Sequence, residues 1–413
     1  MFASSRHLRL ELFCTHGTPV KKNLGHLPAF PIVVSFLNSF CRGGDRDNLF
    51  AALEHRDRVR VVEVNVLRSL LKGLATVMQE PFPALTHLRF ESVEFVAMPT
   101  LPGSFLGGSA PLLRTIYMDG IPFPAAPTLL LSAHDLVYVH LRNIPPTGYI
   151  PPEVMIAGLA ALPRLKQLIF GFESRMSYPD RMRLPPVTRT VLPALTSFCF
   201  DGLFEYFEDL VAQIDTPELN CLQIKYLDQH EVIDLQIPEL CKFIERSEKP
   251  KRFRRAGLLI EPGTVLIGLH LGESSFRLAI QEETICQVVS QLSAMLSDVD
   301  CLFINSDSME GDDELIGNGI RWLELFRPFT SVKALSVDDK ISRHILFVLN
   351  NIAWESAAEV LPALELLCLE NEPVKFVKKF VATRQNVGRP VTFINEEREF
   401  RERLDTLYER SVL

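Results

Sequence analysis

The chain has 413 residues, of which 47% are hydrophobic and 23% charged, so it is long and apolar enough to bury a large core. Its formal net charge of -8 argues against nucleic acid or anionic lipid as a partner, because both need a dominant basic field. No apolar run approaches the roughly 20 residues of a membrane-spanning helix, and the N-terminus lacks the apolar core of a signal peptide.

One short phrase recurs along the chain and predicts repeated strands. It consists of a proline, one further residue and the pattern Leu-x-x-Leu-x-Leu, in which other apolar residues can replace leucine. The last two apolar positions are two residues apart, so they point to the same side of a strand and predict one buried face. Clear copies lie at 83–90, 163–170, 193–200 and 362–369, and weaker copies begin at Leu113, Leu136, Leu219, Val299 and Val332.

Amphipathic or proline-started segments between these strands predict helices on the outer side of a sheet. They cover 66–78, 152–162, 206–214, 238–246, 282–296 and 319–326. A strand followed by a helix in each unit builds a curved, mostly parallel array. We therefore predict an α/β fold, an irregular leucine-rich-repeat-like solenoid over 1–370. The alternative is an ordinary α/β domain in which Pro-x-Leu merely starts strands.

Two stretches depart from this rhythm. Turn residues separate three short apolar runs within 256–281, which predicts a small antiparallel insertion in the solenoid. In 371–413 we expect a C-terminal helical cap that covers the last repeat. Asn395 can cap this helix, and Phe400, Leu404 and Leu407 share one face of it.

Motifs that would carry catalysis or hold a cofactor are incomplete. The segment 107–111 lacks the last glycine of a nucleophile elbow and predicts a turn. The segment 317–319 lacks the remaining glycine of a phosphate-binding loop and a strand-to-helix turn before it. In the acidic loop 305–314, Met309 occupies a calcium-ligand position and Glu310 stands where the glycine of the sharp turn belongs, so we expect a solvated loop. His87 and His140 are expected as solvated side chains on strands, with no metal-binding spacing around them.

We therefore predict a protein that is not an enzyme and that has no cofactor, metal ion or small-molecule ligand. A hydrolase or nucleotide-dependent enzyme built on the repeats is the alternative from a different class.

One basic cluster interrupts the acidic chain. It consists of Lys249, Lys251, Arg252, Arg254 and Arg255, which either form a nuclear import signal or keep a loop hydrated. The cysteines are scattered and form no Cys-x-x-Cys pair, which favours a reducing compartment. We expect a soluble protein of the cytoplasm, or of the nucleus if the cluster acts in import.

The recurring phrases and five further segments resemble a large family of F-box proteins from mushroom-forming fungi. The further segments are 14–20, 107–111, 142–149, 322–329 and 380–385. In that family an N-terminal F-box binds the adaptor of a cullin-RING ubiquitin ligase, and degenerate leucine-rich repeats hold a substrate. Residues 1–8 resemble the junction after the F-box, and 27–34 match the repeat region despite their Leu-Pro start, so we expect the F-box itself to be absent.

The resemblance implies a protein-binding scaffold similar to the substrate-recognition region of an SCF-type ubiquitin ligase. The cullin-ligase adaptor is then a partner only if an F-box is supplied upstream. The alternative is a repeat-only interaction protein with no attachment to a ligase.

The residues on the second face of the predicted strands form a candidate groove for a protein partner. They are Arg89, Glu91, Tyr117, Asp119, His140, Arg142, Asp201, Gln223, Lys225, Phe303, Asn305 and Asp338. The groove is more acidic than basic along its flank, so we expect it to bind a basic or mixed-charge protein segment, with Tyr117 and Phe303 as apolar anchors. The alternative is that irregular spacing twists these positions apart and leaves no single partner.

Overall fold

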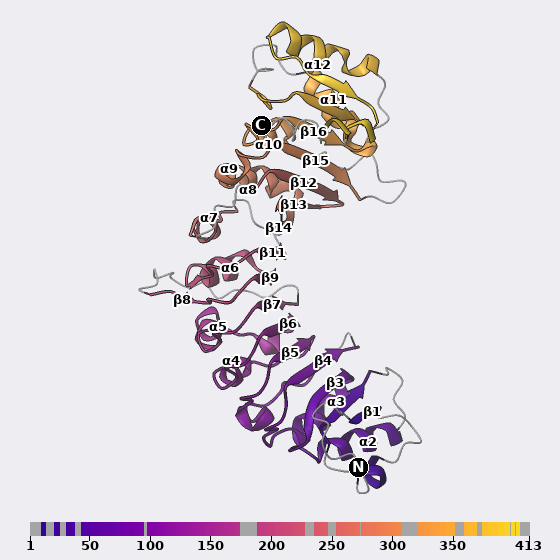
Figure 1. Cartoon of the computed structure of the whole chain (residues 1–413), viewed down its shortest axis with the longest axis vertical. Coiled ribbons are helices and arrows are strands. Elements are labelled where there is room, and N and C mark those ends of the chain that lie inside the picture. The colour runs from indigo at the N-terminus through magenta and orange to yellow at the C-terminus, as the bar shows by residue number, and fades with distance from the viewer. Residues whose placement is uncertain are drawn as a thin grey trace, which may run out of the picture. The chain divides into compact units, whose positions relative to one another are not determined.

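The computed structural model describes residues 10–13, 20–24, 30–37, 43–94, 97–173, 188–227, 235–246, 253–272, 274–307, 320–351, 359–369, 374–396, 398–400 and 402–404. It is a mixed α/β protein whose strands pair mostly in parallel (Figure 1). The chain divides into two compact units, the first comprising Met1–Leu219 with Arg246–Glu248 and the second Asn220–Glu245 with Lys249–Leu413. The boundary predicted from the sequence, between the solenoid over 1–370 and the cap over 371–413, does not coincide with this division and stays a prediction.

The strands of the first unit follow one another in chain order, each parallel to the next. They are β1 (Leu10–Phe13), β2 (Ile32–Phe36), β3 (Val59–Val66), β4 (His87–Ser92), β5 (Thr115–Asp119), β6 (Tyr138–Ile144), β7 (Gln167–Phe172) and β9 (Ser197–Gly202). The short strands β8 (Thr190–Val191) and β10 (Ile214–Asp215) pair separately. The recurring phrase marks β4, β5, β6, β7 and β9 but is absent from β1 to β3.

Helices of the first unit lie beside these strands, and Figure 1 shows α4, α5 and α6 along one side of them. They are α1 (Val20–Leu24), α2 (Gly43–Leu53), α3 (Arg68–Val77), α4 (Ala126–Leu130), α5 (Pro152–Leu159) and α6 (Phe204–Val211), with short 3-10 turns at Phe105–Gly108 and Pro146–Gly148. Three of them coincide with predicted helices. The predicted turn at 107–111 begins in the first 3-10 turn, where Gly107 and Gly108 adopt φ of 67° and 69°, a region that favours glycine.

The recurring phrase forms the same turn in each clear copy. The N–H of its first leucine donates to the carbonyl three residues earlier, at 3.0 to 3.3 Å; the pairs are Leu85 to Phe82, Leu165 to Leu162, Leu195 to Leu192 and Leu364 to Leu361. All three apolar positions of each copy are buried; Leu165 and Leu168 are 1% exposed and Phe170 is fully buried. The prediction that the last two apolar positions share one buried face is confirmed.

The second unit has a different strand order. Its strands are β11 (Cys221–Tyr226), β12 (Arg255–Glu261), β13 (Thr264–Leu271), β14 (Ser274–Gln281), β15 (Cys301–Ser306), β16 (Ala334–Val337), β17 (Leu366–Leu369) and β18 (Thr392–Ile394). Their order in space is β11-β14-β13-β12-β15-β16-β17-β18. Strand β13 is antiparallel to both of its neighbours, and the other pairs are parallel. Antiparallel pairing was expected here, and it separates β11 from β15 by three strands.

The helices of the second unit differ from the prediction at several places. They are α7 (Pro238–Glu245), α8 (Ile285–Gln291), α9 (Ser293–Leu296), α10 (Trp322–Phe326), α11 (Asp339–Asn351) and α12 (Val374–Asn386), with a 3-10 turn at Glu282–Thr284. The single helix predicted over 282–296 is divided into three pieces. Helix α11 was not predicted, and α12 lies within the C-terminal helical cap that was expected over 371–413.

The C-terminal residues cover part of the sheet of the second unit. Phe400 is fully buried and packs with Leu404 against Cys301, Ala334 and Cys368. These three alternate with Leu302, Leu335 and Leu367 along their strands, so they lie on the opposite face of the sheet. A C-terminal helical segment was expected, but it covers the free face of several strands rather than only the last repeat. Leu407 lies outside the described residues.

We predict that Phe400→Ala makes Cys301 reactive. Burial raises the pKa of this thiol to about 12, so it is unreactive while the segment covers it. Removing the ring should speed its alkylation at neutral pH at least about tenfold, as expected when local opening becomes easier by about 1.4 kcal/mol. Peptide mapping after timed alkylation measures this, and Arg398→Ala, a change at an exposed residue of the same segment, should leave the rate unchanged. Equal rates in both variants would show that the segment does not protect the thiol.

Candidate functional site

The first unit brings together seven of the predicted groove residues on the face of its sheet that lies opposite the buried strand positions. We call them the strand-face cluster: Arg89 and Glu91 on β4, Tyr117 and Asp119 on β5, His140 and Arg142 on β6, and Asp201 on β9. The register pairs Arg89 with Tyr117 and Tyr117 with His140, and it pairs Glu91 with Asp119 and Asp119 with Arg142. Because neighbouring strands are about 4.8 Å apart, these side chains are in direct reach of one another.

Three side chains of the cluster form a stack across adjacent strands. The Arg89 guanidinium carbon lies 4.1 Å from the centre of the Tyr117 ring, a cation-π distance. The Tyr117 and His140 rings are stacked, with centroids 3.9 Å apart and planes inclined by 22°. His140 is therefore only 6% exposed, and the expectation of a solvated histidine is wrong at this position. His87, at the other end of β4, is exposed as expected.

Asp119 is the hydrogen-bond acceptor at the centre of the cluster. Its Oδ1 accepts from Asn143 Nδ2 at 2.7 Å, and its Oδ2 lies 3.5 Å from both the Tyr117 hydroxyl and His140 Nε2. Burial by itself would raise the pKa of Asp119 and is the largest single influence. The adjacent His140 ring, the hydrogen bond from Asn143 and the nearby Arg142 outweigh it, so the pKa of Asp119 lies below its usual value.

Two of the residues that complete this arrangement were missed by the sequence analysis. Asn143 adopts a φ of 50°, at an irregularity in the pairing of β6 with β7, and this conformation places its amide on Asp119. An asparagine shortly before two prolines, in 142–149, was the available signal, because asparagine tolerates left-handed backbone. The other is Tyr138, whose hydroxyl lies 3.2 Å from His140 Nδ1.

An ion pair crosses the sheet above a glycine. Arg142 Nε donates to Asp201 Oδ2 at 2.7 Å, although β7 lies between their strands. The position of β7 opposite Asp201 is Gly171, and a Cβ there would lie 2.8 Å from the Asp201 Cβ and carbonyl oxygen. The absence of a side chain at Gly171 therefore lets the pair form.

A cavity of about 600 Å³ opens beside the cluster at the end of the sheet where β4 to β7 terminate. We call it the acidic pocket, because Glu94, Asp119 and Glu173 supply its charge, and Met98 and Pro145 are among its apolar lining residues. Glu94 also accepts a hydrogen bond from the backbone N–H of Arg68 at 2.6 Å, whereas Glu173 is exposed and has no ion pair with any described residue. Carboxylates at an apolar wall suit a cationic side chain.

The remaining predicted groove residues lie in the second unit and do not form one surface there. Gln223 and Lys225 are on β11, whereas Phe303 and Asn305 are on β15, with β14, β13 and β12 between them. The antiparallel insertion was predicted from the sequence, and in the structure its strands separate these two groups of residues.

Two of these residues have structural contacts instead. The Phe303 ring packs edge-on against Phe400, with centroids 6.2 Å apart, so it is not an open anchor. Asp338 accepts from the backbone N–H groups of Ser306 and Ile341, which joins the end of β15 to the start of α11. Burial raises the pKa of Asp338, while these backbone hydrogen bonds act in the opposite direction.

Other sequence predictions fall mainly outside the described residues. These are the incomplete phosphate-loop segment 317–319, most of the acidic loop 305–314 and most of the basic cluster, of which Arg254 and Arg255 are described. Arg254 forms an ion pair with Asp300 at 3.2 Å. Within the described part of the chain there is no group of three or more histidine, cysteine or acidic side chains placed to hold a metal ion. None of the helices in that part has the length and hydrophobicity needed to span a bilayer.

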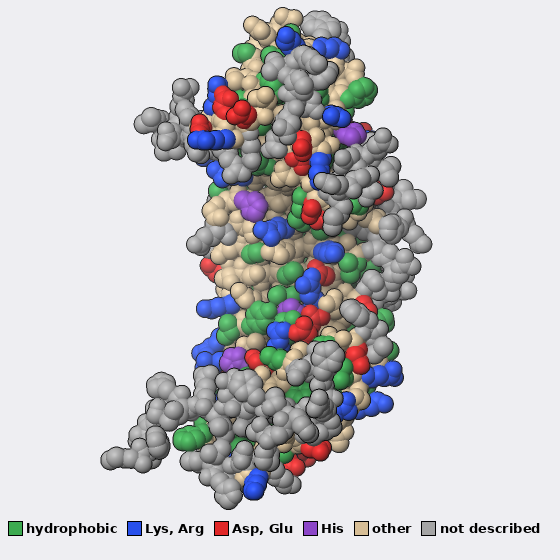
Figure 2. Space-filling model, turned by 90° about the vertical axis from the view of Figure 1, so that its right-hand side faces the viewer, with side chains coloured by type: hydrophobic (Ala, Val, Ile, Leu, Met, Phe, Trp, Pro, Cys, Tyr) green, Lys and Arg blue, Asp and Glu red, His purple; other side chains and the backbone are tan. Residues whose placement is uncertain are grey.

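Figure 2 shows positive, negative and hydrophobic side chains interspersed on one face of the molecule, with no large region of a single charge. No protein-family model matches the sequence, and no curated protein is significantly similar to it. The chemistry of the site therefore has to be inferred from the residues themselves.

We predict that Gly171→Ala destabilises the first unit by about 1–3 kcal/mol, because the added methyl group meets the Asp201 backbone and displaces its ion pair with Arg142. Gly257→Ala is the matched control, since a Cβ on this strand glycine meets nothing within 4 Å. It should be neutral or stabilising by up to about 1 kcal/mol. Urea unfolding of both variants measures the difference, and similar midpoints would show that Gly171 is not required.

We also predict a pH-dependent effect of Asp119→Asn. At pH 7 the loss of the charged acceptor should cost about 1–2 kcal/mol. Because folding lowers the pKa of Asp119, its contribution is complete above the ordinary value of 3.8 and is lost as the pH falls through the lowered value. The gap between the urea midpoints of the variant and the wild type should therefore be constant above about pH 4 and narrow as the pH falls further below 3.8. Glu173→Gln, in the same pocket, should show no such gap, and a gap for Asp119→Asn that did not narrow on acidification below 3.8 would contradict the assignment.

Proposed function

We propose that this chain is a protein-binding scaffold of the leucine-rich-repeat type whose first unit holds a basic or mixed-charge segment of a protein partner. The observation that carries the proposal is the acidic pocket next to the Arg89, Tyr117 and His140 stack. Aromatic and arginine side chains at the centre of a surface, with charge at its rim, are typical of residues that dominate binding between proteins.

The local structure supports a repeat array. The same turn, followed by a strand with two buried positions, recurs at 82–90, 162–170, 192–200 and 361–369. In an array of this kind each unit buries its apolar face against its neighbours, and the opposite face of the strands stays free for a ligand.

The surface is organised before any partner binds. Arg142 is hydrogen-bonded to Asp201, and Asp119 is hydrogen-bonded to Asn143. These side chains therefore lose little conformational freedom on binding. Glu173 and the outer edge of the Tyr117 ring are then the groups that contact a partner, with Glu173 accepting from a lysine or arginine.

We propose that the partner is a substrate of an SCF-type ubiquitin ligase, as the resemblance to fungal F-box proteins implies. The scaffold then acts by proximity, since it positions a target and carries out no bond chemistry. A repeat protein that binds the same kind of target without a ligase is the second candidate. For either role we propose a location in the cytoplasm or the nucleus.

Binding of a labelled basic decapeptide, rich in lysine and arginine, tests the recognition step. Glu173→Lys should weaken binding about tenfold, because it replaces an attraction by a repulsion in the pocket. Glu54→Lys is the control, since it makes the same charge change at an exposed residue outside the pocket. If both variants bind the peptide equally well, the acidic pocket is not the recognition site.

Affinity purification of the tagged chain from fungal cells, followed by mass spectrometry, distinguishes the two roles. Recovery of the cullin adaptor with other proteins would support the ligase receptor, whereas recovery of other proteins alone would support the repeat-only scaffold. Partners that are retained by the wild type and lost from Glu173→Lys are the expected targets.

A further inference from the structure

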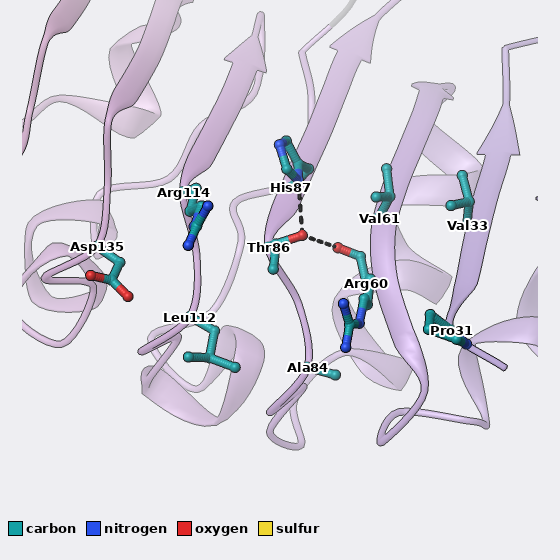
Figure 3. A pocket seen from close by; sticks show the side chains of 10 residues that line it. All are labelled: Pro31, Val33, Arg60, Val61, Ala84, Thr86, His87, Leu112, Arg114 and Asp135. Atoms are coloured by element: carbon teal, nitrogen blue, oxygen red, sulfur yellow. Dashed lines mark hydrogen bonds between the residues drawn. The ribbon is translucent and has the colours of Figure 1, made fainter. Parts of the chain in front are cut away.

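A second cavity lies at the opposite end of the same strands. It has a volume of about 330 Å³ and is located where β3, β4 and β5 begin, as Figure 3 shows. Arg60, His87 and Arg114 line it together with Val61, Thr86 and Leu112. We call it the basic hollow.

The two arginines of the basic hollow are available to a ligand. Arg60 and Arg114 are exposed, and neither side chain has an ion pair or hydrogen bond with any described residue. Other arginines nearby are engaged, for example Arg58 with the Phe30 carbonyl and Arg164 with Asp135 at 2.8 Å. Asp135 is the acidic residue of the lining, and its pairing with Arg164 reduces its ability to neutralise the hollow.

Backbone contacts hold the two arginines in a fixed register. The Thr86 hydroxyl donates to the Arg60 carbonyl at 3.0 Å, and the Arg114 N–H donates to the Thr86 carbonyl at 2.8 Å. Arg60 and Arg114 are therefore two strand spacings apart, about 10 Å, with Thr86 and His87 between them (Figure 3). Two long guanidinium side chains at this separation can converge on one oxyanion.

We propose that the basic hollow binds an oxyanion carried by a protein segment, either the carboxylate of an acidic residue or the phosphate of a phosphorylated one. The lining favours a side chain of a protein, because Leu112 is 48% exposed at the hollow and Val61 adds apolar surface beside the arginines. A nucleic acid fits less well, since the chain has a net charge of -8 and the acidic pocket at the other end of the strands repels a polyanion.

The hollow refines the proposed function and rests on it, because the two sites together define a partner with charges of both signs. Strand β4 begins at His87 in the basic hollow and ends at Ser92 in the acidic pocket. Five residue steps of a strand cover about 17 Å. An extended partner segment that follows the strand would place an acidic or phosphorylated residue about five residues from a lysine or arginine.

Peptide binding to the full chain tests this assignment. The probes are labelled decapeptides with a glutamate cluster, a phosphoserine pair or a lysine cluster, and a ten-nucleotide single-stranded DNA. The variant Arg60→Gln with Arg114→Gln should bind the two anionic peptides at least about tenfold more weakly than the wild type. Lys22→Gln on α1 with Lys72→Gln on α3 is the control, since it removes the same charge from exposed residues outside both cavities and should change these affinities less than about twofold.

The outcomes separate this inference from the proposed function. Tighter binding of the phosphoserine peptide would identify phosphate as the source of the oxyanion, and tighter binding of the glutamate peptide would identify carboxylate. The inference would be overturned if the affinity for the anionic peptides fell equally in both double variants, or if the wild type bound neither anionic peptide. So would DNA binding that is tighter than peptide binding and depends on Arg60 and Arg114. The Arg60 and Arg114 double variant should bind the lysine peptide as tightly as the wild type does. If the wild type does not bind the lysine peptide, the proposed role of the acidic pocket is contradicted, and the inference about the basic hollow is not affected.

Discussion

The arrangement of the first unit depends on one backbone interaction that is repeated at the start of its strands. The carbonyl of the residue before a strand accepts hydrogen bonds from two consecutive N–H groups at the start of the next strand, as the Thr86 carbonyl does from Arg114 and Thr115. The carbonyls of Arg114, Val137 and Lys166 do the same. These bonds set the register, and a shift by one residue would turn every buried side chain to the other face.

The register creates the contacts on the free face. Because Arg89, Tyr117 and His140 are aligned on adjacent strands, they stack, and the residues two positions later bring Asp119 beside Arg142. The same alignment places basic residues where the strands begin and acidic residues where they end. The face therefore has charges of opposite sign at its two ends, with aromatic surface between them.

The second unit shows how the same strand type can be closed to a ligand. Its last strands are buried on both faces, since Cys301, Cys368 and Leu366 lie under Phe400 and Leu404. The C-terminal segment covers these apolar side chains. In the second unit the predicted groove residue Phe303 is covered, whereas Lys225 and Asn305 stay exposed.

The sequence alone determined which strand positions are buried, because the spacing of Leu165, Leu168 and Phe170 and of its copies is a local property of the chain. It also brought seven groove residues to the correct face, since alternation along a strand is local as well. Only the tertiary structure decided that Gly171 lets Arg142 reach Asp201, that Asn143 turns toward Asp119, and that three strands separate β11 from β15. Each of these depends on contacts between residues far apart in the chain, for which a spacing pattern holds no information.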